Sequence, residues 1–430
     1  MRTPLLRDLQ VRGLVADMTN PDELDAHLSQ GSRTVYCGFD PTAESLHVGS
    51  LLPLLGLRRV QLHGHRPIVL IGGGTGLIGD PSGKAGERAL NPEEQVAAWA
   101  EQLKRQVARF VDFEGPRAAK LLDNYTWLSE LNVIPFLRDV GKEFSVGAMI
   151  AKESVKSRLG RSDAGLSYTE FSYQILQAYD FLVLCRDYEC TIQIGGSDQW
   201  GNITAGMDLI RRLLAVPAFG LTLPLVTKAD GRKFGKTETG TVWLDPAKTS
   251  PYEMYQFWVN TADADVVSYL KYFTFLTPDD IADLEATVRR APEKREAQRV
   301  LAREVTGLVH GAAAIEEAER ITDALFTGDV KSLTREEAAQ ACSAMPRMEL
   351  TLGADPVPLT DVLTQAGLAE SKKRARELIA AGAIQMNGEK VRSADARVSR
   401  DRALHGKYLI FRKGKKTYHA VTLAQPGRDR

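Results

Sequence analysis

The chain has 430 residues, and its 55 Lys and Arg balance 55 Asp and Glu to a formal net charge of zero. This length predicts two or three domains, and the ordinary apolar and charged fractions predict a globular protein with a full core. No run of about 18 apolar residues occurs, which argues against a membrane span. The first ten residues carry charges and Pro4 but no apolar secretory stretch, so we expect a cytoplasmic protein.

The cysteines and the charge distribution bear on compartment and partner. Cys37, Cys185, Cys190 and Cys342 show no C-x-x-C spacing, which argues against a zinc ribbon and fits reduced thiols. Residues 346–430 hold 17 Lys and Arg against 9 Asp and Glu, a net charge of +8, so the rest of the chain carries −8. A basic segment on an acidic body indicates a polyanionic partner, although a solvated basic surface has the same composition.

The first half of the chain alternates short apolar runs with amphipathic stretches. Strands are expected at 34–39, 66–71, 120–123, 191–195 and 221–227, and helices at 48–63, 92–112, 168–181 and 198–214. Strands that alternate with helices predict an α/β fold with a parallel sheet covered on both faces. Such sheets bind ligands beyond the carboxyl ends of their strands.

The second half has a different pattern. A Gly-, Lys- and Thr-rich loop at 228–240 precedes predicted helices at 251–259, 264–273, 278–290 and 292–310. Residues 328–357 contain several Gly and Pro and are interpreted as a connector. Residues 358–424 form a basic unit with a helix-rich start and short strands around an Asn387-Gly388 turn.

One glycine pattern suggests a function that its context does not support. Gly74, Gly76 and Gly79 match the G-x-G-x-x-G pattern of dinucleotide sites. However, Asp80-Pro81-Ser82-Gly83 interrupts the helix that this pattern requires, and no suitable acidic residue ends a following strand. A dinucleotide oxidoreductase is therefore only a distant alternative, and Gly83-Lys84 does not have P-loop spacing.

Two other segments indicate phosphate chemistry. Leu46-His47-Val48-Gly49-Ser50 opens a predicted helix after the first strand, where free N–H groups and the helix dipole favour phosphate. Lys233-Phe234-Gly235-Lys236-Thr237 lies in the loop after the last strand, where two lysines could clamp a leaving pyrophosphate. Each signal alone is weak, because a surface His and a solvated charged loop are ordinary features. Their order along the chain is the layout of class I aminoacyl-tRNA synthetases.

Further segments resemble the bacterial type of tyrosyl-tRNA synthetase within that class. They are Tyr36-Cys37-Gly38-Phe39-Asp40-Pro41-Thr42, Gly79-Asp80-Pro81-Ser82-Gly83, Tyr173 through Asp180, and Gly195-Gly196-Ser197-Asp198-Gln199-Trp200-Gly201-Asn202. The C-terminal unit resembles a small RNA-binding domain shared with a ribosomal small-subunit protein. The resemblance covers nearly the whole chain.

The resemblance implies a fold and an activity. The implied parts are a Rossmann-like catalytic domain at 1–230, a signature loop with an all-helical anticodon-side domain at 231–330, a linker at 331–357, and an α+β RNA-binding domain of the alpha-L, ribosomal-protein-like type at 358–430. The implied enzyme is a ligase that activates L-tyrosine with ATP to tyrosyl-adenylate and pyrophosphate and then transfers tyrosine to the 3′ end of tRNA(Tyr). Mg²⁺ would accompany the phosphates of ATP without a protein cage, and the implied assembly is a homodimer.

The resemblance also implies the tyrosine-binding residues. Tyr36 and Asp180 would hydrogen-bond the phenol of the substrate, and Tyr173, Gln177 and Asp80 its ammonium group. Tyr173, Gln177 and Asp180 have the i, i+4 and i+7 spacing of one helix face, which an exposed polar face would also show. A site built to accept a hydrogen bond from a phenol leaves a charge unpaired when phenylalanine enters, which gives selectivity.

The implied nucleotide contacts lie at the other end of the site. Asp40, Gly196, Asp198 and Gln199 would meet the adenylate and the tyrosine backbone. The full set of ATP contacts is Cys37, Gly38, Asp40, His47, Gly49, Ser50, Gly196, Asp198 and Lys236, with Cys37 at the ribose. The groups expected to act on the phosphates are Thr42, His47, Lys84, Arg88, Lys233, Lys236 and Thr237. The family's helix-start signature usually ends in a second His, which is Ser50 here, so one ATP contact is in doubt.

RNA binding is expected of the basic C-terminal unit. Its candidate residues are Lys372, Lys373, Arg374, Arg376, Arg412, Lys413, Lys415 and Lys416. Two basic clusters on a small unit favour contacts with phosphates, which supply affinity more than sequence choice.

Two alternatives within the same kind of fold remain open. A tryptophanyl-type synthetase shares the architecture, although Tyr36 and Asp180 favour a phenol over an indole. A non-catalytic RNA-binding relative should have lost Asp80, Asp198 or the loop lysines, and this chain has all of them.

Overall fold

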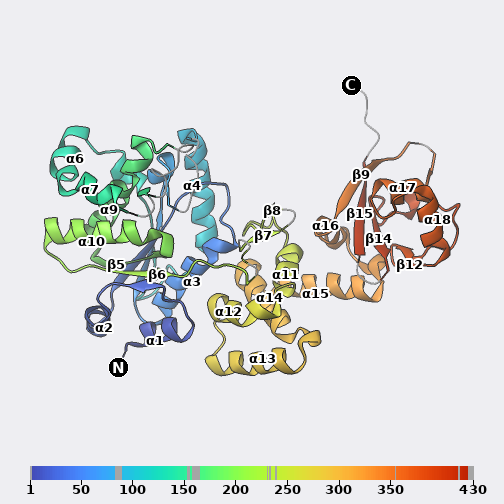
Figure 1. Cartoon of the computed structure of the whole chain (residues 1–430), viewed down its shortest axis with the longest axis horizontal. Coiled ribbons are helices and arrows are strands. Elements are labelled where there is room, and N and C mark those ends of the chain that lie inside the picture. The colour runs from blue at the N-terminus through green and yellow to red at the C-terminus, as the bar shows by residue number, and fades with distance from the viewer. Residues whose placement is uncertain are drawn as a thin grey trace. The chain divides into compact units, whose positions relative to one another are not determined.

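The computed structural model describes residues 2–82, 90–152, 155–156, 165–229, 231, 234–237 (236 and 237 as backbone only), 240–353, 355–414 and 417–424. Its contacts divide the chain into two compact units. Figure 1 colours the chain by residue number, from blue at the N-terminus to red at the C-terminus. Unit 1 contains Met1–Asp245 and Ala262–Ala297, and unit 2 contains Pro246–Thr261 and Gln298–Arg430. Among the described helices, none is both long enough and apolar enough to cross a membrane.

Unit 1 is built on a six-stranded sheet in the order β1-β6-β5-β2-β3-β4, in which every pair is parallel except β1 with β6. The strands are β1 (Asp17–Met18), β2 (Thr34–Phe39), β3 (Arg66–Ile71), β4 (Lys120–Asp123), β5 (Cys190–Gly196) and β6 (Phe219–Leu223). The predicted parallel sheet is confirmed. The last strand was predicted too late in the chain, at 221–227; Pro224 follows Leu223 and has no N–H for the ladder.

Helices enclose this sheet (Figure 1). Those of unit 1 are α1 (Pro4–Val11), α2 (Pro21–Ser29), α3 (Val48–Leu62), α4 (Glu93–Val107), α5 (Tyr125–Leu128), α6 (Val133–Asp139), α7 (Val146–Ile150), α9 (Tyr168–Tyr188), α10 (Trp200–Leu214), α12 (Asp263–Phe273) and α13 (Pro278–Arg290). Single 3₁₀ turns are η1 (Thr75–Leu77), η2 (Gly141–Glu143), η3 (Ser197–Gln199) and η4 (Pro292–Lys294), and β7 (Lys236–Thr237) pairs with β8 (Gly240–Thr241). α3 packs on β2 and β3, and α9 and α10 pack on β5.

Helix α9 is longer than its sequence pattern predicted. It begins where the Ser167 side chain accepts a hydrogen bond from the Glu170 N–H, a standard N-cap. It continues past the predicted end at 181 because Phe181, Leu182 and Leu184 are all buried in the core between α9 and the sheet. Tyr36 of β2 packs against Phe181, with ring centroids 5.2 Å apart, so the two elements share one core. This contact brings the carboxyl end of β2 next to the middle of α9.

Unit 2 combines helices with a second sheet. Its helices are α11 (Pro251–Val259), α14 (Glu296–His310), α15 (Ala312–Thr327), α16 (Arg335–Ser343), α17 (Leu359–Gln365) and α18 (Lys372–Ala380), with single turns at η5 (Val330–Ser332) and η6 (Arg400–Arg402). The sheet has the order β12-β11-β14-β15-β9, formed by β9 (Arg347–Thr351), β11 (Ile384–Met386), β12 (Glu389–Lys390), β14 (Tyr408–Lys413) and β15 (Thr417–Ala424); β10 (Val357–Pro358) pairs with β13 (Arg397–Val398).

Two features of unit 2 bear on the predictions. The Asn387-Gly388 turn is confirmed: both residues have positive φ, 49° and 81°, as a tight hairpin turn requires. The interpretation of 328–357 as a connector missed α16 and β9. β9 pairs in parallel with β15, some 70 residues later, and only Leu350 of its residues is buried, so it shows no alternation of buried and exposed residues.

Candidate active site

A cavity of about 420 Å³ lies at the carboxyl ends of β2 and β5, with α9 and the start of α3 in its walls. This is the position at which parallel sheets bind ligands. Fifteen residues predicted from the sequence line it: Tyr36, Cys37, Gly38, Asp40, Thr42, His47, Gly49, Ser50, Asp80, Tyr173, Gln177, Asp180, Gly196, Asp198 and Gln199. The fold therefore brings segments that are up to 160 residues apart in the sequence to one site.

The deep end of the cavity contains a buried carboxyl group with two donors. Asp180 is 2% exposed, and its two oxygens accept hydrogen bonds from Asn124 Nδ2 at 2.8 Å and Trp127 Nε1 at 2.7 Å. Burial raises the pKa of Asp180 to about 8, against the opposite influence of the two donors. Asp180 therefore keeps a fixed position before any ligand arrives.

Tyr36 lies beside Asp180 in the wall of the same cavity. Its side chain is 1% exposed, and within the described residues its hydroxyl has no hydrogen-bond partner. Burial, followed by the charge of Asp180, raises its pKa well above the usual value, so the phenol stays neutral. A buried hydroxyl without a partner costs free energy, which a ligand with a matching polar group would recover.

Next to this pair lies a network of polar side chains. Tyr173 Oη and Thr75 Oγ1 each donate to Asp40, both at 2.8 Å. Gln199 Nε2 donates to Asp80 at 2.7 Å and to Asp198 at 3.2 Å. The acidic groups of this network give the middle of the cavity a negative potential, which suits a ligand with an ammonium group.

The open end of the cavity is formed by the start of α3. His47 is its N-cap, and Nδ1 accepts a hydrogen bond from the Gly49 N–H at 3.0 Å. A Cβ at Gly49 would lie 2.7 Å from the His47 ring, so glycine here allows the ring to cap the helix. Thr42 and His47 are exposed, and Ser50 is half-buried. The N–H groups of Val48, Gly49 and Ser50 donate to the Val242 carbonyl, His47 Nδ1 and the His47 carbonyl, so it is the positive end of the α3 dipole that favours an anion here.

The glycines of the misleading G-x-G-x-x-G pattern have structural reasons. A Cβ at Gly74 would lie 2.9 Å from Leu128 Cδ1, a Cβ at Gly76 would lie 3.0 Å from Pro41 Cδ, and Gly79 has a φ of +89°.

Two glycines just before that pattern are constrained as well. A Cβ at Gly72 would lie 1.9 Å from Asp40 Oδ1, and a Cβ at Gly73 would lie 2.3 Å from Asp123 Oδ1. These residues are glycine because the chain after β3 passes between two carboxylates of the cavity region. The close approach is to side chains of the protein itself, and no dinucleotide is needed to account for it.

Some predicted residues are not described. Lys84, Arg88 and Lys233 lie outside the described residues, and the structure gives only the backbone of Lys236 and Thr237. Their positions relative to the cavity stay a prediction.

The sequence interpretation also missed residues of the cavity, including Thr75, Asn124 and Gln193. Two of them had a usable signal. Asn124 directly follows β4 at the carboxyl edge of the sheet, where ligand-site residues gather. Gln193 is a polar residue inside the otherwise apolar strand β5, and its side chain is 3% exposed. Thr75 had no such signal.

The basic residues of unit 2 lie at the surface. Lys372, Lys373, Arg374 and Arg376 are exposed at the start of α18. Lys413 Nζ donates to the Leu368 carbonyl at 2.8 Å, just before α18, so β14 ends beside that helix start. Arg412 lies over the Tyr418 ring at 5.5 Å, and Lys415 and Lys416 lie outside the described residues.

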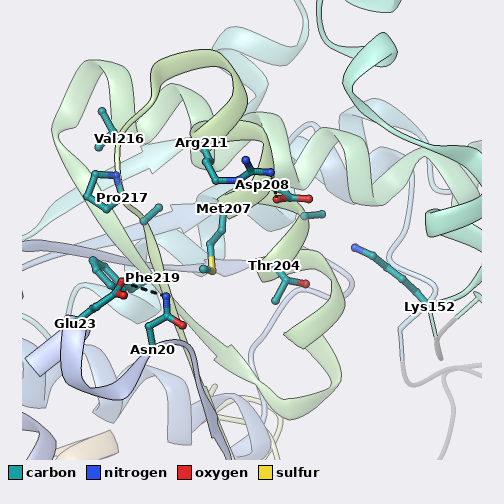
Figure 2. Close-up of a pocket in the computed structure, with 12 residues that line it drawn as sticks. Asn20, Glu23, Lys152, Thr204, Met207, Asp208, Arg211, Val216, Pro217 and Phe219 are labelled. Atoms are coloured by element: carbon teal, nitrogen blue, oxygen red, sulfur yellow. Dashed lines mark hydrogen bonds and ion pairs between the residues drawn. The ribbon is translucent and has the colours of Figure 1, made fainter.

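A second cavity, of about 500 Å³, lies beside α10 (Figure 2). Met207, Val216, Pro217 and Phe219 form its apolar part, while Asp208 and Arg211 pair with each other at 3.0 Å. It is the larger of the two, but none of the residues predicted for catalysis or binding lines it. The smaller cavity, with its buried polar groups, is the candidate active site.

Comparison with known proteins gives the family. Residues 28–327 match the family model of tRNA synthetases class I (W and Y), and residues 337–421 match that of the tyrosine–tRNA ligase SYY-like C-terminal domain. The parallel sheet, the site at its carboxyl edge and these matches define a class I tRNA synthetase.

Individual relatives identify the family within this class of synthetases. The tyrosine–tRNA ligase of Aliivibrio fischeri is 56% identical over 417 residues, which are 96% of this chain and 97% of the relative. That of Geobacillus kaustophilus is 55% identical over 422 residues, 98% of this chain and 100% of the relative. A C-terminally truncated mitochondrial tyrosyl-tRNA synthetase of Aspergillus nidulans superposes with a TM-score of 0.69 at 30% identity, over 76% of this chain and 95% of that one. The chain belongs to the bacterial-type tyrosyl-tRNA synthetase family.

Proposed function

We propose that the chain activates L-tyrosine with ATP, forming tyrosyl-adenylate and pyrophosphate, and then transfers tyrosine to the 3′ end of tRNA(Tyr). The observation that carries the proposal is the buried pair of Tyr36 and Asp180 in a cavity that also contains the start of α3. A hydroxyl and a carboxyl at the closed end suit a phenol, which can both donate and accept a hydrogen bond. The relatives' names support the same activity.

The residues divide between the two substrates. In this proposal, Tyr36 and Asp180 bind the phenol, and Tyr173, Gln177 and Asp80 bind the ammonium group, with Gln199 bridging Asp80 and Asp198. Asp40, Gly196 and Asp198 meet the adenylate, and Cys37 and Gly38 line the ribose side. Thr42 and His47, at the exposed end, meet the terminal phosphates together with Lys84, Arg88, Lys233, Lys236 and Thr237.

The chemistry needs no general base. The tyrosine carboxylate is ionised at neutral pH, so it attacks the α-phosphorus of ATP directly, and the bond from that phosphorus to the bridging oxygen breaks. Negative charge then develops on the leaving pyrophosphate, where the α3 start and the loop lysines stabilise it. When bound, Mg²⁺ screens the phosphates, mainly through water and phosphate oxygens. In the second step the terminal ribose hydroxyl of tRNA attacks the carbonyl of the adenylate and AMP leaves.

Amino-acid-dependent exchange of pyrophosphate into ATP tests the first step. We expect exchange with tyrosine and little with tryptophan or phenylalanine, because an indole or an unsubstituted ring cannot satisfy both Tyr36 and Asp180. Faster exchange with tryptophan would favour the tryptophanyl alternative. Absence of exchange with every amino acid would favour a non-catalytic RNA-binding relative.

RNA binding is proposed for the exposed basic cluster of α18. This helix lies within the segment that matches the C-terminal family model. The full-length variant with Lys372, Lys373, Arg374 and Arg376 all changed to Ala should keep tyrosine-dependent exchange and lose most aminoacylation, because phosphate contacts supply affinity for RNA. A matched control changes four exposed charges of α13 in unit 1, Asp279, Asp283, Arg289 and Arg290. Equal loss of exchange and aminoacylation would contradict the proposal that α18 serves RNA binding alone.

A truncation that removes the C-terminal sheet should start before Arg347, because a cut at residue 350 would split β9.

Assembly and location complete the proposal. Large apolar side chains are exposed on α6 and α7, with Ile134 at 70%, Val133 at 65% and Val146 at 60% exposure. We expect them to be covered in a homodimer, as the family resemblance implies, and light scattering measures the mass in solution. A cytoplasmic location fits the four buried, unpaired cysteines and the supply of ATP and tRNA there.

A further inference from the structure

The signature loop is attached to α12 by an aromatic contact. The Phe234 ring stacks on Phe273, with centroids 5.3 Å apart and an interplanar angle of 13°, and meets Tyr269 edge-on at 5.1 Å. Phe273 is fully buried and Tyr269 is 4% exposed, so both partners belong to the core. Phe234 itself lines the candidate active site. One residue of the loop is thus fixed to a rigid helix and faces the cavity.

The chain entering the loop follows the same helix. Tyr269 Oη donates to the Thr227 carbonyl at 3.2 Å, and the Ala229 N–H donates to Asp265 Oδ1 at 2.9 Å. Asp265, Tyr269 and Phe273 are spaced four residues apart, so they form one stripe along α12. The described residues between 227 and 234 therefore have contacts at three successive turns of this helix.

The chain leaving the loop is attached to the start of α3. Gly235 has a φ of +77°, and a Cβ there would lie 2.9 Å from Val48 Cγ2. The Val242 N–H donates to the Gly235 carbonyl, and the Val48 N–H donates to the Val242 carbonyl, both at 3.0 Å. The Leu244 N–H donates to the Leu46 carbonyl at 2.8 Å. The two phosphate-directed segments of the sequence are therefore joined through their backbones.

The C-terminal end of α12 is held by hydrogen bonds from two arginines. Arg12 and Arg59 both donate to the Thr274 carbonyl, directly after Phe273. Asp8 pairs with Arg12 at 2.7 Å and with Arg59 at 3.0 Å, which holds both guanidinium groups in place. Cations at the last carbonyls of a helix satisfy acceptors that have no partner in the helix. This arrangement limits movement of Phe273 and hence of the ring stacked on it.

We propose that Phe234 is a positioning residue for adenylate formation: its contact with α12 fixes the backbone between Lys233 and Lys236, the two loop lysines proposed above to bind the phosphates. This inference rests on the proposed function. Lysine side chains are long and flexible, so fixing the backbone between the two lysines restricts the volume that their ammonium groups occupy. Charge stabilisation of a leaving pyrophosphate depends on such restriction, because groups placed in advance need no reorganisation during the reaction.

The test compares full-length Phe234→Ala with the wild type in single-turnover formation of tyrosyl-adenylate. We expect the rate constant to fall about 10- to 100-fold, the range for misplaced catalytic groups. Tyrosine affinity, measured by equilibrium dialysis without ATP, should stay within about twofold, because Phe234 adjoins Gly235, which lies against Val48 at the start of α3, and is not proposed to bind tyrosine. Unchanged tyrosine affinity also reports that the variant is folded.

The matched control is Phe275→Ala. Phe275 is a half-buried phenylalanine two residues beyond Phe273, and its ring lies over Arg59 at 4.6 Å rather than against the loop. We expect this variant to keep the rate constant within about threefold. Adding Phe273→Leu to Phe234→Ala should slow the reaction no further, since the stack is already lost and contacting residues are not additive.

The outcomes separate the inference from the proposed function. A wild-type rate in Phe234→Ala, an equal loss in Phe275→Ala, or additive losses in the double variant would each overturn the positioning role. Failure of the wild type to form tyrosyl-adenylate at all would instead overturn the proposed function.

Discussion

The two ends of the cavity are built differently. At the closed end, Asp180 is 2% exposed and already has hydrogen bonds from Asn124 and Trp127. At the open end, Thr42 and His47 are exposed, and the protein offers the positive end of the α3 dipole and a loop. The comparison teaches that the group proposed to select the amino acid is fixed by the core, whereas the groups proposed to meet the phosphates lie near solvent. This division suits a reaction in which one substrate must be discriminated and the other gives up a highly charged leaving group.

The strongest test of this contrast is Asp180→Ala. It removes an acceptor and leaves the donors of Asn124, Trp127 and the substrate phenol unsatisfied in a buried site. We expect kcat/KM for tyrosine in pyrophosphate exchange to fall about 100-fold or more, because each buried donor left without an acceptor costs about 1–3 kcal/mol. The KM for ATP should stay near the wild-type value. A similar rise in the KM for ATP would mean that the two ends are not separate.

Asn124→Ala should have a smaller effect at the same end. Asn124 is 1% exposed, donates to Asp180, and accepts from the Gly74 N–H at 2.8 Å. We expect about a tenfold loss in kcat/KM for tyrosine, since one donor to Asp180 remains. Thr126→Ala, at an exposed neighbouring position, is the control and should have little effect. If both variants behaved alike, prior orientation of Asp180 would not matter for selectivity.

Ser50→His probes the open end, where the family's signature usually has His. A longer side chain can add one hydrogen bond to the nucleotide, on the order of 1 kcal/mol, so we expect less than about a tenfold change in the KM for ATP. Tyrosine affinity should not change. An increase in exchange rate of several orders of magnitude would show that the natural open end is impaired, contrary to the contrast drawn above.

An effect of a different kind, on stability and not on catalysis, is expected from the titration of Asp180. Burial raises the pKa of Asp180 from 3.8 to about 8, so the folded state retains a proton that the unfolded state has lost. This contribution to stability is present below pH 4 and is lost as the pH rises to about 8. The Tm of the wild type should therefore fall relative to that of Asp180→Asn between pH 5 and pH 8. Parallel Tm curves for the two proteins would show that Asp180 is already ionised in the empty site.

Much of the sheet was predictable because its signals are local. β2, β3 and β4 lie at the residues predicted from short apolar runs, and the helices at 251–259 and 278–290 have the predicted bounds, each beginning at a proline that follows a capping residue. β9 was not predictable, because Leu350 is its one buried residue and an apolar alternation is therefore missing. The true end of α9 was missed because burial of Phe181 and Leu184 against the sheet extends the helix.

The sequence alone determined the residue types of the site, their order along the chain and the family, since motifs of glycine, histidine, aspartate and lysine keep their spacing without reference to the fold. Only the tertiary structure decided which of these groups share an environment. It placed Asn124 and Trp127 on Asp180 and stacked Phe234 on Phe273, and it gave the Tyr36 hydroxyl no partner among the residues described. The physical reason is that burial and hydrogen-bond partners depend on contacts between distant segments, and these exist only once the sheet and its helices have packed together.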